Sequence, residues 1–210
     1  SANLALARPG WMVLLAVVLI GVFAWFGRLV VVDNNLTGML PDDHETSVAN
    51  KIVDANLAGI LNYEFDIRGE PGDLKRPEVL RAMEAYGAWV KTLPSIRNVS
   101  SAATYVARSH ALMGGEDRVP DTGPAVAQLL LLMESHEELQ KVVDMDYARG
   151  RMVVHGEDHG ANYFANIEAQ MRDAIPKFFA GTGVEAQLTG TGVVAYRGIN
   201  NVTFDLRDSL

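Results

Sequence analysis

The chain has no cysteine and a marked shortage of basic residues. Without cysteine it can form neither disulfides nor thiolate metal sites, so a folded domain must rely on its apolar core. Its 18 Lys and Arg residues are outnumbered by 26 Asp and Glu residues. A nucleic-acid-binding protein needs a basic face to neutralise phosphates. This charge balance therefore argues against nucleic acid as a partner.

Long apolar runs are also absent, with one exception near the start of the chain. Residues 11–27 carry no charge. As a helix they span roughly 26 Å, and roughly 33 Å with the continuation to Val32, which matches a bilayer core of about 30 Å. Ten strongly apolar side chains favour insertion by about 3 to 6 kcal/mol. We expect a membrane-spanning helix within residues 1–32.

The competing interpretation of this run is a cleaved signal peptide, whose apolar core is shorter and ends in small residues. Here the run ends in the bulky pair Trp25-Phe26, which favours an anchor. Arg8 precedes the run and no acidic residue occurs in residues 1–32, so the positive-inside rule predicts a cytoplasmic N-terminus. With Arg8 and Arg28 taken from the 18 basic residues, 16 remain against 26 acidic ones, so residues 33–210 carry a formal charge of −10. We expect that acidic domain outside the cytoplasm.

Two strand–helix–strand units follow the apolar run and a short helix over residues 44–57. In the first unit, apolar residues alternate over 61–68, recur with helical spacing over 77–93, and are followed by a return strand over 96–101. In the second, a hairpin is expected from 143–147 into 151–155, then a helix over 161–179 and a strand over 184–188. The predicted fold is α+β, a ferredoxin-like split βαβ sandwich with both helices on one face of the sheet.

A helical insertion over residues 102–141 separates the two units. It contains the run Leu129-Leu130-Leu131-Leu132-Met133, which is apolar on every side of a helix. Such a helix is usually buried in a core. The alternative is that one side of it contacts a neighbouring domain or a hydrophobic substrate. The domain is thus expected over 33–192, with a helical segment over 193–210 that is too polar to cross a membrane.

Candidate sites for chemistry are few. His155 and Glu157 would project to the same side of an extended segment and could bind a divalent ion, but the neighbouring glycines favour a solvated turn. The pairs Ser109-His110 and Ser135-His136 lie on expected helices, where adjacent side chains diverge. Residues 190–192, Gly-Thr-Gly, lack the remainder of a phosphate loop and are interpreted as a turn. We predict no catalytic residue, no metal site and no cofactor.

The order of these features resembles the resistance-nodulation-division transporters, in particular the lipid and hydrophobe exporters related to the mycobacterial large membrane proteins. Seven short segments carry the resemblance: Val32–Leu36 and Leu40–His44 after the membrane helix, Pro77–Leu80, Leu93–Ser101, Ala127–Leu131, Val143–Arg149 and Leu188–Gly192. The resemblance covers nearly the whole chain. It implies one extracytoplasmic porter loop, with Ala127–Arg149 more like the second loop than the first.

The resemblance further implies a proton-driven exporter in a bacterial inner membrane, with the main domain in the periplasm. Its partners would be the lipid bilayer, a hydrophobic or lipid substrate, and the rest of the transporter with its second porter domain; a homo-oligomer is compatible with this scheme. The family's proton-relay acids lie in other membrane helices. Residues 129–133 become the candidate lining of the substrate path. The alternative is a signal-anchored extracytoplasmic binding or scaffold domain.

Overall fold

The computed structural model describes residues 9–27, 41, 43–56, 59 and 61–198. The chain divides into two compact units, residues 1–33 and 34–210. In the first unit, helix α2 (Pro9–Gly27) contains the expected apolar run. Its segment Gly10–Gly27 is long and apolar enough to cross a membrane, and it buries none of its surface against protein. Such a helix can be a membrane anchor or a signal sequence. The expected continuation of this helix to Val32 lies outside the described residues.

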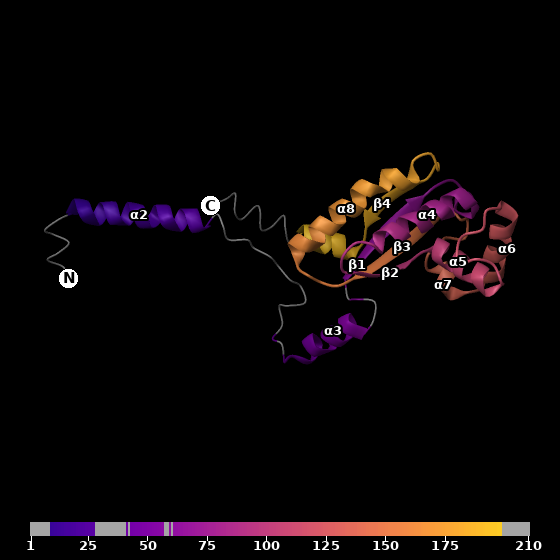
Figure 1. Ribbon diagram of the computed structural model, residues 1–210, viewed down its shortest axis with the longest axis horizontal. Helices are drawn as coiled ribbons and strands as arrows, with labels where there is room; N and C mark the ends of the chain where they lie inside the picture. Colours follow the sequence, from indigo (N-terminus) through magenta and orange to yellow (C-terminus); the bar gives the residue numbers. More distant parts are fainter. Residues whose placement is uncertain (1–8, 28–40, 42, 57–58, 60, 199–210) are drawn as a thin grey trace. The chain divides into compact units, whose positions relative to one another are not determined.

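Four strands of the second unit form one antiparallel sheet in the order β2-β3-β1-β4 (Figure 1). They are β1 (Leu61–Arg68), β2 (Ile96–Ser100), β3 (Arg149–Gly156) and β4 (Glu185–Thr189). The central strands β1 and β3 pair over eight residues, from Leu61 opposite Gly156 to Arg68 opposite Arg149. The prediction that the four strand segments share a sheet is confirmed, and the protein is of mixed α+β class.

Helices α4 (Pro77–Val90) and α8 (Ala161–Phe179) cover the same face of this sheet (Figure 1). Strand residues two apart point to the same side, and Tyr63 stacks on Phe164 of α8 while Phe65 meets Tyr86 of α4 edge to face. The two helices are also joined directly, because the buried Tyr86 hydroxyl donates to the Met171 carbonyl at 2.8 Å. This aromatic layer is the centre of the core.

The predicted helical insertion is present at one end of the sheet (Figure 1). It consists of α5 (Ala102–Leu112), α6 (Gly123–Met133) and the short α7 (Glu137–Gln140). Ser101 caps α5 by accepting from the Thr104 backbone N–H, and Pro124 occupies the first turn of α6. A 3₁₀ turn, η2 (Asp73–Lys75), precedes α4, and α3 (Glu45–Asn56) precedes β1.

The expected hairpin over 143–155 is wrong in its first arm. Only Val143 pairs with the following strand, opposite Gly150. Tyr147 then adopts φ +53°, which ends any extended run, and the Asp144 carboxylate accepts from the backbone N–H of Ala148 and Arg149. Residues 146–148 instead accept hydrogen bonds from the turn over 69–74. The hydrogen bonds to the Asp144 carboxylate and those from the turn over 69–74 therefore prevail over the strand that the alternating pattern predicts.

Helical structure resumes at residues 191–198, so the prediction of a simple turn over 190–192 holds only for Gly190, with φ +107°. The 191–198 helix packs on the core through Tyr196, which stacks on Phe164 at 4.5 Å. Gly192 lies so close to β1 that an added Cβ would be 2.5 Å from the Asn62 carbonyl oxygen. Residues 199–210 of the expected tail lie outside the described residues.

Candidate functional site

The sheet face opposite α4 and α8 is lined by polar and charged side chains. Register places Glu64 and Asp66 of β1 on this face, across from Val153 and Arg151 of β3 and from Thr189 and Gln187 of β4. The alternation of β1 therefore gives one apolar face, on which α4 and α8 pack, and one polar face.

Two ion-pair groups organise this face. Asp66 is buried and accepts from Arg149 Nε and Nη2 at 2.6 and 2.8 Å and from Arg68 Nε at 2.6 Å. Burial alone would raise the pKa of Asp66, but the hydrogen bonds from Arg149 and Arg68 outweigh it, so the pKa lies below its ordinary value. The second pair joins Arg151 Nη2 to the largely buried Glu64 Oε1 at 2.6 Å.

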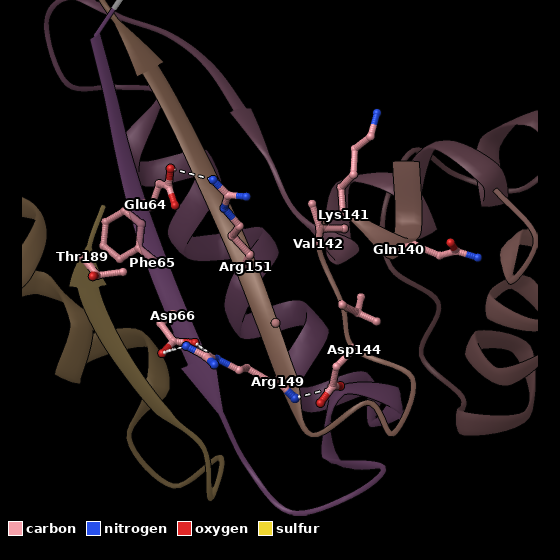
Figure 2. Close-up of a pocket in the computed structure, with 12 residues that line it drawn as sticks. Glu64, Phe65, Asp66, Gln140, Lys141, Val142, Asp144, Arg149, Arg151 and Thr189 are labelled. Carbon is pink, nitrogen blue, oxygen red and sulfur yellow. Dashed lines mark hydrogen bonds and ion pairs between the residues drawn. The ribbon is translucent and has the colours of Figure 1, made fainter. Parts of the chain in front are cut away.

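These pairs form one wall of a pocket of about 320 Å³ (Figure 2). The opposite wall is the segment Gln140–Asp144, held close to β3 because the Arg151 N–H donates to the Val142 carbonyl at 2.8 Å. The Asp144 carboxylate accepts hydrogen bonds from the backbone N–H groups of Ala148 and Arg149, which hold this segment against the start of β3. The volume falls in the range typical of small-molecule sites.

A second pocket of about 590 Å³ adjoins the first and shares Gln140, Val143 and Asp144 with it. Two further lining residues are Met145, which is 96% exposed, and Tyr147. The Lys75 Nζ atom lies over the Tyr147 ring, 4.2 Å from the ring centroid. We call the two pockets together the sheet-face groove, lined at one end by Glu64, Asp66, Arg149 and Arg151 and at the other by Leu139, Val143, Met145 and Tyr147.

The five residues predicted to line a substrate path divide between core and surface. Leu129, Leu130 and Met133 are buried in the core, where Met133 Sδ accepts from Ser109 Oγ at 2.7 Å. Leu131 and Leu132 are 70% and 54% exposed. The core interpretation therefore applies to three of the five residues, and only Leu131 and Leu132 can contact a molecule outside the domain. None of the five lines the sheet-face groove.

The cluster over 155–159 does not bring its acids and histidines together as ligands, and no group of metal-binding side chains occurs among the described residues. Glu157 forms an ion pair with Arg97 and accepts from His159 Nε2 at 3.0 Å. His155 lies on the polar sheet face opposite Asn62, and its burial lowers its pKa. The Gly160 backbone N–H donates to the Asp158 carboxylate at 3.0 Å, so Asp158 stabilises the turn between β3 and α8, although no side chain caps α8 at Gly160.

Of the two serine–histidine pairs, Ser109-His110 lies on α5 as expected, whereas Ser135-His136 lies in the turn between α6 and α7 and not on a helix. The Ser109 hydroxyl donates to Met133 Sδ, while His110 Nδ1 lies 2.9 Å from the Arg118 carbonyl oxygen. No nucleophile–base pair results between Ser109 and His110.

Sequence reasoning missed Glu168, whose side chain is only 6% exposed within α8. It is neutralised by Arg172 at 3.4 Å and by Arg197 of the 191–198 helix. The four-residue spacing to Arg172 is visible in the sequence, but the partner at 197 is not, because it depends on how the last helix packs.

Comparison with known proteins gives no relative: no family model matches the chain, and no curated protein matches it significantly.

Proposed function

We propose that the second unit is a ferredoxin-like split βαβ domain with a helical insertion between its halves. The strand order β2-β3-β1-β4, the two strand–helix–strand units and the shared helix face support this assignment. Insertion of α5, α6 and α7 between β2 and β3 lengthens the connection without changing the sheet.

We further propose that the chain is one extracytoplasmic porter domain, with its preceding membrane helix, of a resistance-nodulation-division exporter of hydrophobic or lipid-like molecules. One observation carries this proposal: an uncharged helix of membrane length, Gly10–Gly27, precedes an acidic α+β domain. The domain performs no chemistry itself and contributes to the substrate path within a bacterial inner-membrane transporter.

The proposed orientation places the N-terminus in the cytoplasm and the domain in the periplasm. Fusions of alkaline phosphatase and of green fluorescent protein after Leu210 test it. We expect phosphatase activity and no fluorescence. Fluorescence without phosphatase activity would overturn the orientation. Recovery of the domain in the soluble periplasmic fraction, without residues 1–32, would favour the signal-sequence interpretation and a free binding or scaffold domain.

The exposed leucines of α6 supply the test of the transport role. In the full-length parent, Leu131→Glu and Leu132→Glu should leave the protein folded and reduce export of a lipid substrate, because both side chains already face outward. Leu130→Glu is the matched control, since it places a charge in the core and should unfold the domain. Folded Leu131 and Leu132 variants with full export would refute a lining role for α6.

A further inference from the structure

The sheet-face groove joins two chemically different ends. Its charged end is lined by three acidic groups, Glu64, Asp66 and Asp144, and by three basic groups, Lys141, Arg149 and Arg151. Its other end is lined by Leu139, Val143, Met145 and Tyr147, with Glu134 at its margin and with Gln140 and Asp144 shared between the two pockets. The two ends meet at Gln140, Val143 and Asp144, which line both pockets.

The basic groups at the charged end can accept a further partner. The side chains of Arg149 and Arg151 are 62% and 50% exposed even though each contacts a carboxylate of β1. A guanidinium carries five N–H donors, so each arginine has more donors than these ion pairs use. Phosphate and carboxylate oxygens are the acceptors that suit such donors best.

The acidic side chains on the same wall determine which kind of charged ligand group fits there, here called the head group. A purely anionic head would meet Arg149 and Arg151 but also the carboxylates of Glu64, Asp66 and Asp144. A head group with both a phosphate and an ammonium group can meet opposite charges at each position, because the six charged side chains balance. The lining therefore favours a zwitterionic head.

The second pocket supplies room for an apolar chain. Met145 is almost fully exposed, and an unbranched thioether side chain adapts its shape to an apolar ligand. An apolar group that covers Met145 beside Val143 and the Tyr147 ring would remove this side chain from water, which favours binding.

We propose that the sheet-face groove binds an amphiphile with a zwitterionic phosphate-containing head at Arg149 and Arg151 and an acyl chain over Val143 and Met145. This inference rests on the proposed export function, because it names the class of molecule handled, but binding can be measured without transport.

The test uses the full chain in amphipol with methionine methyl groups labelled with carbon-13, titrated with dihexanoylphosphatidylcholine below its critical micelle concentration. We expect the Met145 methyl resonance to shift with saturation. Met113, which is 60% exposed on the helical insertion, is the internal control and should not shift. Met145→Gln and Met113→Gln assign the two resonances.

Two variants separate the ends of the groove. Arg151→Gln should weaken Kd about ten-fold, the effect of losing one charge-assisted contact, while Arg108→Gln, outside the groove, should not change it. Met145→Gln, whose binding is followed by isothermal titration calorimetry because it lacks the reporting methyl group, should weaken Kd several-fold without unfolding the domain, because Met145 is exposed. If Arg151→Gln unfolds the protein, Met145→Gln alone decides the result.

The probes distinguish the head group from the chain and from free phosphate. An alkyl glucoside and inorganic phosphate should bind at least ten-fold more weakly than the phosphocholine lipid, and dihexanoylphosphatidic acid more weakly as well. Equal binding of any of these probes, or an equal shift of Met113, would overturn the proposal. Lipid binding at the groove in a parent that exports nothing would refute the proposed export function instead. Export with no binding at the groove would refute only this inference.

Discussion

Replacing Phe164 with alanine tests the central element of the core. Phe164 is fully buried, and its ring lies between Tyr63 of β1 and Tyr196 of the last helix, at centroid distances of 4.3 and 4.5 Å with nearly parallel planes. Removal of a buried phenylalanine costs about 3 to 5 kcal/mol. Two stacked contacts, worth about 0.5 to 1.5 kcal/mol each, place Phe164→Ala in the upper part of that range.

A loss of about 4 to 5 kcal/mol should lower Tm by about 8 to 20 °C for a domain of this size. Thermal unfolding of the full chain in detergent, followed by circular dichroism, measures it. Phe178→Ala is the matched control, because Phe178 is only partly buried and meets Tyr86 and Trp89 in edge-to-face or tilted contacts. We expect about half the loss there. Equal or reversed losses would show that the stack is not the centre of the core.

Three further changes probe other parts of the domain. Asp66→Asn should lower the free energy of unfolding by about 1 to 3 kcal/mol at pH 7. Because the folded-state pKa of Asp66 is depressed, its contribution is fully present above about pH 4 and is lost as pH falls through the folded-state pKa, so the difference in urea unfolding between the two proteins should shrink steadily as pH is lowered from about 4. Gly192→Ala should lower the free energy of unfolding by about 1 to 3 kcal/mol in the same assay, since the added Cβ would clash with the Asn62 carbonyl. Gly198→Ala is the control and should lower it less, because a Cβ at Gly198 meets nothing within 4 Å. Equal losses in the two variants would contradict the close approach of Gly192 to β1. Phe65→Asp should prevent folding by burying an unpaired charge, and a cooperative unfolding transition near that of the unchanged chain would contradict its place in the core.

The strands and long helices could be predicted because their determinants are local. The alternation from Leu61 to Arg68 gives β1 with its predicted bounds, and Pro77 marks the start of α4. The helix ends earlier than the predicted residue 93, at Val90, where the next residues form a turn before Pro94.

The site could not be predicted because its contacts join distant parts of the chain. Arg149 meets Asp66 across 83 positions, and no local pattern identifies that pair. Similarly, the apolar run of α6 does not reveal that Leu130 packs inward and Leu131 outward, since this depends on the position of its neighbours. The hydrogen bond that the Asp144 carboxylate accepts and the positive φ of Tyr147 prevent residues 143–147 from forming the predicted strand. Val143, Asp144, Met145 and Tyr147 line the sheet-face groove instead.

The outer strands of the sheet limit how the domain can associate. β2 and β4 have five residues each, and β2 shifts register between Ile96 and Asn98. Edge strands of this length, one of them irregular, offer few aligned backbone groups to an incoming strand, which disfavours both amyloid-like stacking and partner recognition by strand addition. We therefore expect contacts of this sheet with another protein to be made by side chains, so that single substitutions can strengthen or abolish them without altering the backbone.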